Sequence, residues 1–254
     1  MITIICSNLD SIKWIKGYLE CVNNLLLQEF NIHFIDAGSK DGSWEKIKEY
    51  KFREGINSNY TLKNNCSIYE AWNIGYKNST TTYCINLNTD DRLFPNALNI
   101  LSKYTEIHTD IDVFYSPCLI TNHYDHHHYH DIHDWVSFSK DELLKNCICG
   151  PFPMVRTKSA LEVGLFNTNF DISGDYEMWL RLESNNKKIM KIKEPIGGYY
   201  LNPKGKSTHQ QTLKKHLKED EIIRAMYNNE EKKGFCTSRL IAIKKILKIY
   251  IYGI

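Results

Sequence analysis

The chain has 254 residues, of which 42% are hydrophobic and 24% are charged, and its formal net charge is +2. This composition is typical of a folded globular protein and excludes wholesale disorder, and the near balance of charge argues against a general nucleic-acid binder. A chain of this length should bury about three quarters of the surface that it exposes when unfolded, so it needs no disulfide or metal to fold.

Strands and helices alternate through the first half of the chain. In the segment 11–28, apolar residues recur three and four positions apart, which indicates one face of a helix. The alternation predicts a mostly parallel sheet with helices on both faces. The expected strands are 2–6, 32–35, 60–62 and 83–87, and the expected helices are 11–28, 43–50, 68–76 and 95–104.

The second half is less regular and contains no internal repeat and no long linker. We therefore expect a single domain over residues 1–210, followed by a charged helical extension over 211–254. Strands are predicted at 113–121, 189–192 and 198–201, helices at 139–147, 157–163 and 175–185, and a polar loop at 123–134.

The cellular compartment is predicted from membrane and signal segments and from the cysteines. No run of about 18 apolar residues could form a transmembrane helix, and the N-terminal residues do not resemble a signal peptide. Eight cysteines are scattered mostly through apolar runs, which favours buried reduced thiols in a cytoplasmic protein. Cys147 and Cys149 match no common zinc or redox spacing.

Acidic residues follow two of the predicted strands, as Asp36 and as the pair Asp90-Asp91. Ligands of open parallel sheets bind beyond the carboxyl ends of the strands. Carboxylates there would repel a bare phosphate. They indicate either a divalent metal that bridges them to a diphosphate, or acceptors for hydrogen bonds from a base or ribose.

Four segments, in order, resemble signatures of the family 2 glycosyltransferases, which have the GT-A fold. The first, FIDAGSKDGS (34–43), resembles the family's Asp-x-Gly-Ser-x-Asp-Gly-Ser/Thr signature, and the second, SIYEAWNIG (67–75), resembles a Gly-Ile-Tyr-Asp-Ala-Met-Asn-x-Gly segment found in one branch. The third, LNTDDRLFP (87–95), stands where the family has its metal-binding DXD motif. The fourth, GDYEMWLRL (174–182), resembles the family's acceptor-side block.

The resemblance implies a Rossmann-like, mostly parallel central sheet with helices on both faces and a small acceptor-side subregion. Residues 1–104 would form the nucleotide-sugar-binding half and residues 105–210 the acceptor-side half. The implied activity is that of an inverting, metal-dependent hexosyltransferase of polysaccharide biosynthesis. It would move a sugar from a nucleotide-sugar donor, with a UDP-sugar favoured, to a hydroxyl of a glycan or lipid-linked acceptor.

The resemblance also implies a set of donor-binding residues. Asp36 would accept a hydrogen bond from the nucleobase, and this role is favoured over the alternative that Asp36 only caps the turn at Gly38. Lys206 lies in a segment similar to the family's flexible closing segment, and a basic solvated loop is the alternative. The other expected donor-site residues are Ser7, Asn65, Tyr69, Asn73, Asn88 and Asp90, among which Tyr69 could equally be a packing residue.

The implied metal ligands are Asp91 and Asp90, which would hold Mn²⁺ or Mg²⁺ on the diphosphate. Asn88 replaces the first Asp of the usual motif, which removes one charge. The alternative is an acidic cap on the helix at Pro95. Asp175 would be the general base; it also suits the first turn of the helix 175–185, and both roles can hold.

Two features stand outside these motifs. Six of the ten histidines lie between His123 and His133; alone this suggests metal binding, but without regular ligand spacing we expect a solvated loop that touches the acceptor sugar. Residues 238–252 form a basic amphipathic stretch, which favours either peripheral membrane contact or packing on the protein. One branch of the family has an Asp three residues before its Ile-Tyr pair, where this chain has Asn65. The replacements Asn88 and Asn65 also keep open a catalytically weak or inactive protein that binds a sugar nucleotide or glycan.

Overall fold

The computed structural model describes residues 1–206 and 209–228. Its strands are β1 (Ile2–Asn8), β2 (Phe30–Asp36), β3 (Ile56–Leu62), β4 (Tyr83–Asn86), β5 (Arg92–Leu93), β6 (Val113–Tyr115), β7 (Cys118–Thr121), β8 (Asp131–His133), β9 (Met154–Arg156), β10 (Ile189–Lys191) and β11 (Gly197–Tyr200). Its helices are α1 (Ile12–Asn23), α2 (Ser43–Glu49), α3 (Ile68–Asn78), α4 (Ala97–Ile107), α5 (Lys140–Lys145), α6 (Thr157–Glu162), α7 (Gly174–Ser184) and α8 (Gln210–Tyr227).

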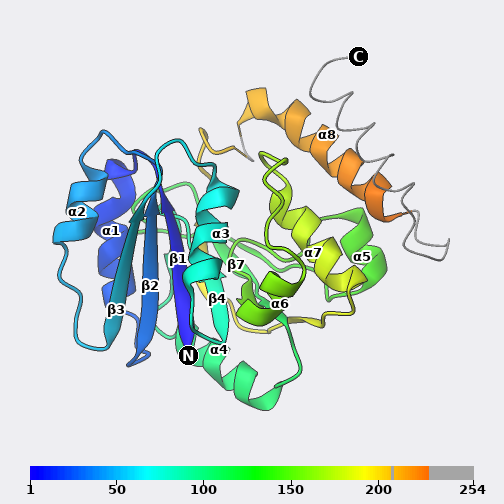
Figure 1. Ribbon diagram of the computed structural model, residues 1–254, viewed down its shortest axis with the longest axis horizontal. Coiled ribbons are helices and arrows are strands. Elements are labelled where there is room, and N and C mark those ends of the chain that lie inside the picture. Colours follow the sequence, from blue (N-terminus) through cyan, green and yellow to red (C-terminus); the bar gives the residue numbers. More distant parts are fainter. Residues whose placement is uncertain (207–208, 229–254) are drawn as a thin grey trace.

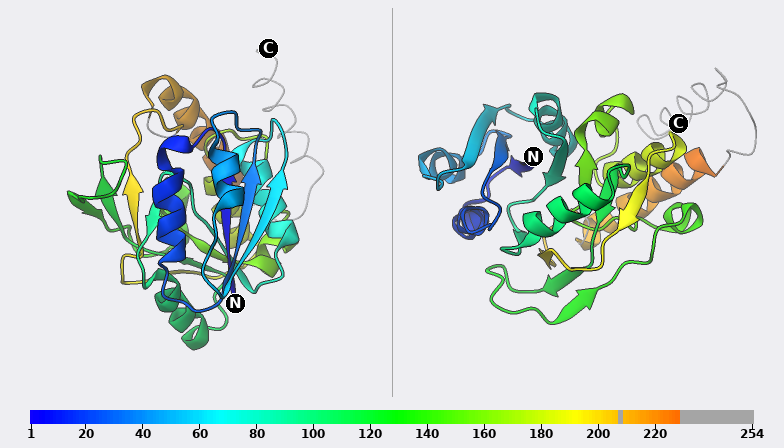
Figure 2. Two further views of the ribbon diagram at one scale, coloured as in Figure 1. Left: turned by 90° about the vertical axis from the view of Figure 1, so that its left-hand side faces the viewer. Right: turned by 90° about the horizontal axis from the view of Figure 1, so that it is seen from below.

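The strands form two sheets. The larger has seven strands in the order β10-β6-β9-β4-β1-β2-β3, and the smaller has four in the order β5-β11-β7-β8. In the large sheet, β1 pairs in parallel with β2 and β4, and β6 with β10; β9 runs antiparallel to both β4 and β6. The prediction of a mostly parallel sheet is therefore confirmed, and helices lie on both of its sides (Figures 1 and 2).

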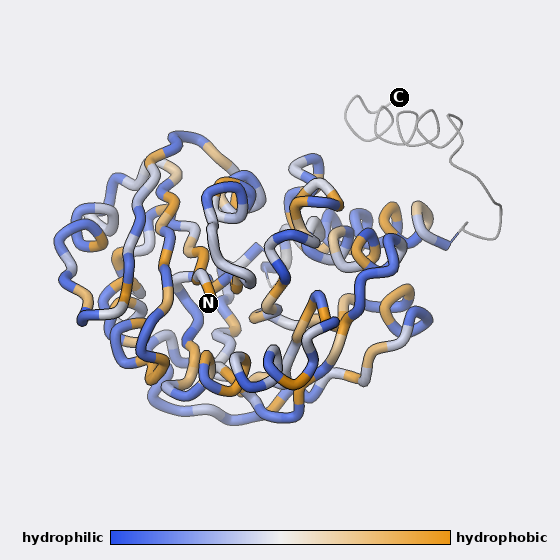
Figure 3. The backbone as a smooth tube through the Cα atoms, turned by 60° about the horizontal axis from the view of Figure 1, so that its bottom comes forward, coloured by the Kyte–Doolittle hydropathy of each residue, from blue (hydrophilic) through white to orange (hydrophobic). Residues whose placement is uncertain are grey.

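Each face of the large sheet has its own hydrophobic core, because successive side chains of a strand point to opposite faces. Ile4 of β1 belongs to the core beneath α1, α2 and α4. Its neighbour Ile5 belongs to the core beneath α3, α5, α6, α7 and α8. Figure 3 shows apolar residues in the strands and hydrophilic residues along the outer loops.

The prediction of one strand over 113–121 is wrong. The segment forms β6 in the large sheet and β7 in the small sheet, separated by Ser116 and Pro117. Proline has no amide hydrogen to give to a strand ladder, so it favours a break there. The sequence also failed to reveal β5, β8 and β9, because each has three residues or fewer, too short to show an alternating pattern.

The C-terminal helix α8 packs alongside α5 and α7 (Figure 1). Its Ile223 is fully buried in the second core, and Glu219 is 1% exposed. The basic stretch 238–252 lies outside the described residues. Within the described part of the chain, all seven cysteines are free thiols, and none of its helices is both long and apolar enough to cross a bilayer.

Candidate active site

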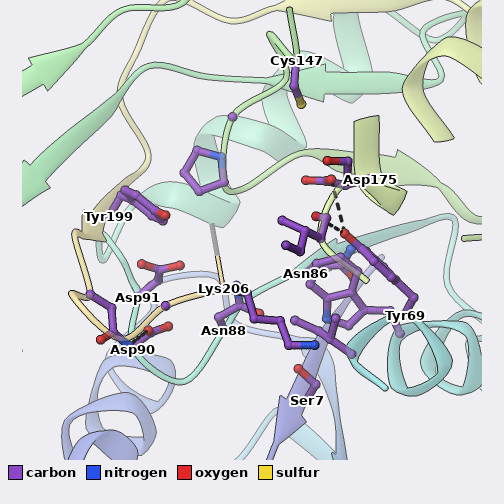
Figure 4. A pocket seen from close by; sticks show the side chains of 18 of the residues that line it. Ser7, Tyr69, Asn86, Asn88, Asp90, Asp91, Cys147, Asp175, Tyr199 and Lys206 are labelled. Atoms are coloured by element: carbon purple, nitrogen blue, oxygen red, sulfur yellow. Dashed lines mark hydrogen bonds between the residues drawn. The ribbon is translucent and has the colours of Figure 1, made fainter. Parts of the chain in front are cut away.

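A cavity of about 770 Å³ lies beyond the carboxyl ends of β1, β2 and β4. The start of α7 and the segment after β11 complete its wall, so residues far apart in sequence meet there (Figure 4). This is the edge at which parallel sheets bind ligands. The predicted site residues that line the cavity are Ser7, Tyr69, Asn88, Asp90, Asp91, Asp175 and Lys206.

The structure places Asp36 behind the cavity wall rather than in its lining. The side chain is fully buried, and its Oδ1 accepts hydrogen bonds from the amides of Gly38 (2.8 Å) and Ser39 (2.9 Å). Its Oδ2 accepts from Asn8 Nδ2 at 2.6 Å and from the Ser39 hydroxyl at 2.7 Å. Asp36 therefore holds the turn after β2, as in the turn-capping interpretation.

Two further predicted donor residues do not line the cavity either. The side-chain amide of Asn73 donates to the carbonyl of Phe166 at 2.8 Å and accepts from its amide at 2.9 Å, so both ends are engaged. Asn65 has a φ of 58° and donates its backbone amide to Ala37. Asn73 thus links α3 to Phe166, and Asn65 links its turn to the loop after β2. A contact of either residue with the donor stays a prediction.

The chain turns sharply between Asn88 and Asp91, where the amide of Asp91 donates to the carbonyl of Asn88. Asp91 is 1% exposed, and its Oδ1 accepts a hydrogen bond from the Tyr200 amide at 3.0 Å. Asp90 Oδ2 accepts from Asn202 at 3.0 Å. Burial, aided by the charge of Asp90, raises the pKa of Asp91 well above its ordinary value, and burial also raises the pKa of Asp90.

Arg92 fixes this acidic turn, a role that the sequence reasoning missed. Its guanidinium donates to the carbonyls of Thr89 at 2.9 Å and Asp91 at 2.7 Å, and to Trp14 of α1 at 3.1 Å. Gly17 leaves room for it, because a Cβ there would lie 2.9 Å from an Arg92 nitrogen. The positive charge also lowers the pKa of Asp91, against the larger effect of burial.

The acidic turn offers oxygen donors suited to a divalent cation. Asn88 Oδ1 is buried without a hydrogen-bond partner, and no hydrogen bond links Asp91 Oδ2 to another described residue. The described residues contain no group of three or more acidic, histidine or cysteine ligands. Mg²⁺, however, often binds one or two carboxylates and completes its coordination sphere with water and substrate phosphates. The residues of the turn therefore fit Mn²⁺ or Mg²⁺.

Asp175 lies in the first turn of α7, on the cavity wall. Its Oδ1 accepts a hydrogen bond from the Tyr176 amide at 2.9 Å, and the Tyr69 hydroxyl lies 3.4 Å away. No hydrogen bond links Oδ2 to another described residue. Burial raises the pKa of this carboxyl above its ordinary value. A fixed carboxylate with one accessible oxygen and a raised pKa is suited to accept a proton.

The histidine segment is more structured than predicted. Its end forms β8 in the small sheet, and its His126 is partly buried against the acidic turn, with Nε2 2.7 Å from the carbonyl oxygen of Asp90. Burial lowers the pKa of His126 to about 4. The loop therefore covers the acidic turn rather than lying wholly in solvent. Long-range packing decides this placement, and the sequence alone does not reveal it.

Lys206 contributes a cation to the rim of the cavity. Its Nζ lies 2.5 Å from Asp171 Oδ1, and Figure 4 shows its side chain between the acidic turn and Tyr69. Aromatic residues that the sequence reasoning did not single out also line the cavity, among them His133, Trp135 and Tyr199. The cavity thus combines an acidic turn, a separate carboxylate, one rim cation and an aromatic wall.

Solved structures with similar folds include complexes with nucleotide sugars. TarS from S. aureus in complex with UDP-GlcNAc has a TM-score of 0.71 at 12% identity, over 98% of this chain and 73% of that one. A mannosyltransferase from Pyrobaculum calidifontis in complex with GDP-Man and Mn²⁺ has a TM-score of 0.63 at 11% identity, over 98% and 81%.

A longer TarS structure has a TM-score of 0.69 at 13% identity, and the chain covers only 44% of it. A search among curated proteins found none that matches the sequence. The family model described as glycosyl transferase family 2 matches residues 4–162, more than half of the chain. This match and the shared GT-A fold show that the chain belongs to glycosyl transferase family 2 and is a glycosyltransferase.

Proposed function

We propose that the protein is an inverting, metal-dependent glycosyltransferase that moves a sugar from a nucleotide-sugar donor, preferably a UDP-sugar, to a hydroxyl of a glycan or lipid-linked acceptor. One observation carries the proposal: the acidic turn and Asp175 line the same cavity, from separate elements (Figure 4). This arrangement gives the leaving diphosphate and the incoming hydroxyl each its own partner.

Asp175 acts as the general base. Its carboxylate takes the proton of the acceptor hydroxyl while that oxygen forms a bond to the anomeric carbon. The bond between the anomeric carbon and the diphosphate oxygen breaks in the same displacement, and the nucleoside diphosphate leaves with the bonding electrons. The attack from the opposite face inverts the anomeric configuration. A positioned carboxylate contributes about 10²–10⁴-fold to such a step.

Asp91, Asp90 and Asn88 would hold Mn²⁺ or Mg²⁺ by their side-chain oxygens. When bound, the ion supplies positive charge that stabilises the leaving diphosphate. The Mn²⁺ in the mannosyltransferase complex supports this assignment. Lys206, a rim cation paired with Asp171, offers a second positive charge toward the donor. The UDP and UDP-GlcNAc complexes of TarS support a uridine donor, whereas GDP-Man in the mannosyltransferase marks guanosine as the competing base.

The test is release of nucleoside diphosphate from a panel of UDP- and GDP-sugars with Mn²⁺, in the presence of glycan acceptors. Asp175→Asn is expected to lower kcat at least about 100-fold while donor binding persists. Asp91→Asn is expected to weaken Mn²⁺-dependent donor binding. Asp141→Asn, an exposed carboxylate of α5, is the matched control and should behave like the wild type. Full turnover in Asp175→Asn would refute the proposed base.

A second candidate, binding of a sugar nucleotide or glycan without turnover, is favoured by the replacements Asn88 and Asn65. Asn88 stands where the motif has a carboxylate, so the turn carries one charge fewer for the cation. Donor binding without any turnover across a broad acceptor panel would favour this candidate, and restoration of turnover by Asn88→Asp would identify the lost charge as its cause.

A further inference from the structure

The loop that leads into α7 is held by a carboxylate from the far end of the chain. Glu219 of α8 is 1% exposed. Its Oε1 accepts a hydrogen bond from the Asp171 amide at 3.1 Å, and its Oε2 accepts from the amides of Ile172 and Ser173, both at 2.9 Å. Three successive backbone donors therefore converge on one side chain, two residues before the proposed base Asp175.

The last of these donors belongs to the start of α7, and the other two lie in the loop just before it. Ser173 is the N-cap residue of α7, yet its side chain makes no capping hydrogen bond. Its hydroxyl donates instead to Asp220 of α8 at 2.6 Å. A negative charge near a helix N-terminus is stabilising, because the unpaired amides and the helix dipole present positive charge there. Glu219 and Asp220 thus add from α8 to the negative charge that Asp175 and Glu177 provide in the first turn of α7.

The same loop is fixed from the opposite side by Tyr69 of α3. Its hydroxyl donates to the carbonyl of Ile172 at 2.5 Å and accepts from the amide of Gly174 at 2.9 Å. Gly174 fits closely against this ring, since a Cβ there would lie 2.7 Å from Tyr69. The loop 171–174 is therefore clamped between α3 and α8, and Asp175 follows it directly.

We propose that Glu219 is a positioning residue: by binding the amides of residues 171–173 it fixes the direction in which Asp175 faces the acceptor hydroxyl, which makes α8 part of the catalytic apparatus. The inference rests on the proposed function of Asp175. A displacement of a catalytic group by about 1 Å can cost about 100-fold in rate, so the loss of this anchor should reach the chemical step.

Glu219→Gln is the informative substitution because it keeps the shape of the side chain. Glutamine has one acceptor oxygen and a donating amide group. If the oxygen stays on the amides of Ile172 and Ser173, the NH₂ group faces the amide of Asp171, donor against donor. A role in filling space would tolerate this change, whereas a role in binding three N–H groups would not.

The experiment compares the wild type, Glu219→Gln and Glu221→Gln, which changes an exposed carboxylate on the same helix. With the donor saturating, Glu219→Gln should lower kcat about 10–100-fold, while the Kd for UDP with Mn²⁺ and the KM for the donor change less than about twofold. Glu221→Gln should match the wild type in each quantity. An unchanged kcat in Glu219→Gln, or equal losses in kcat and donor affinity, would overturn the inference.

A double variant shows whether Glu219 acts through Asp175. In an Asp175→Ala background, Glu219→Gln should lower the residual rate no further, because the group that it positions is gone. Losses that multiply in the double variant would show an independent role and refute the inference. Full turnover in Asp175→Ala alone would instead refute the proposed function, so the two failures are distinguishable.

Should Glu219→Gln fail to fold, Glu219→Asp provides a milder change. It keeps the charge and both acceptor oxygens but shortens the side chain by one methylene. An intermediate loss of kcat with unchanged donor binding supports the inference, and wild-type kcat in a folded Glu219→Asp variant opposes it. Circular dichroism and thermal unfolding confirm the fold of each variant.

Discussion

At the scale of single residues, Asp175 combines two properties that the sequence motif alone does not separate. It occupies the first turn of α7, where a carboxylate accepts the Tyr176 amide and suits the helix dipole. It also lines the cavity, where burial raises its pKa. The helix start fixes one oxygen, and no hydrogen bond links the other to a described residue, so the structural role leaves that oxygen available for the proposed catalytic one.

The raised pKa of Asp175 predicts the acidic limb of the rate profile. The base works only when ionised, so kcat should fall as the pH drops through its pKa. Because burial raises that pKa, the midpoint should lie above about 3.9, the ordinary value for Asp. The profile of kcat should be measured with donor and Mn²⁺ saturating. A rate that stays flat down to pH 4 would contradict the assignment.

The same pKa shift predicts an effect on stability. A folded-state pKa raised above the unfolded value means that ionised Asp175 destabilises the fold, so the stability is lower above the folded-state pKa than below the unfolded one. Asp175→Asn removes this charge and should raise Tm at pH 8. The gain should shrink as the pH falls toward 4; a gain independent of pH would point to another cause.

At the scale of elements, α3 carries two buried tyrosines with opposite hydrogen-bond states. The Tyr69 hydroxyl bonds the loop before α7. The Tyr76 hydroxyl, about two turns further along the same face of the helix, is buried without a hydrogen-bond partner. A buried polar group costs free energy unless it is hydrogen-bonded, so the two hydroxyls should contribute to stability with opposite signs.

Tyr69→Phe is therefore expected to lower the free energy of unfolding by about 1–3 kcal/mol, since it leaves the amide of Gly174 and the carbonyl of Ile172 without their partner. Tyr76→Phe, the matched control on the same helix, should be neutral or stabilising. Urea denaturation of both variants measures the difference. Equal destabilisation by the two substitutions would show that ring packing, and not the hydroxyl, decides.

The acidic turn between β4 and β5 depends on Arg92, which predicts a substitution effect beyond stability. Arg92→Lys loses the forked donor group that joins Thr89, Asp91 and Trp14. We expect Mn²⁺-dependent donor binding to weaken about tenfold, as for other residues that orient metal ligands. Isothermal titration with UDP and Mn²⁺ measures it.

Arg156→Lys is the control for this experiment. Arg156 also donates to two backbone carbonyls, those of Thr109 and Ile111, but it does not line the cavity. It should lower Tm without changing the Kd for UDP and Mn²⁺. If Arg156→Lys weakened binding as much as Arg92→Lys, general destabilisation and not the acidic turn would explain the effect.

The elements that sequence reasoning identified are those with a long periodic pattern. The helix face in 11–28 and the apolar strands of the first half lie in the structure as α1, β1, β2 and β4, with ends shifted by a few residues. The strand β9 has three residues and pairs with β4 and β6 only through the tertiary fold. Pairings of this kind leave no local pattern for periodicity to detect.

At the scale of the whole molecule, the candidate cavity draws its wall from both sheets and from α3, α7 and the segment after β11. A ligand bound there contacts parts of the chain that are far apart in sequence. Asp91 and Tyr200, for example, are 109 residues apart. Binding should therefore stabilise the fold as one unit and raise the cooperativity of its unfolding.

This predicts a linked effect of nucleotide and metal on Tm. UDP at about 100 times its Kd, with Mn²⁺ present, should stabilise the protein by about 2.7 kcal/mol, or about 5–10 °C in Tm. Chelation of the metal should remove most of the increase, and Asp91→Asn should show little of it in either condition. A rise in Tm that is equal with and without metal would contradict the proposed ligands.

The candidate site could be predicted only in part. Asp91 and Asp175 line the cavity as the motifs imply, because the carboxyl end of β4 and the start of α7 both face it. Asp36 and Asn73 occupy motif positions but are engaged by neighbouring backbone and side chains. Arg92 and Glu219 act through backbone groups, which any sequence offers, so no motif marks them.

The place of β9 in the large sheet implies an order in which the sheet can form during synthesis on the ribosome. β9 lies between β4 and β6 and joins them with antiparallel ladders. A nascent chain that ends before Met154 therefore has β1 to β4 able to pair while β6 has no neighbour to accept it. The part of the sheet formed by β1 to β4 is expected to acquire protease resistance first, and a translation arrest before this point should leave an exposed sheet edge prone to self-association.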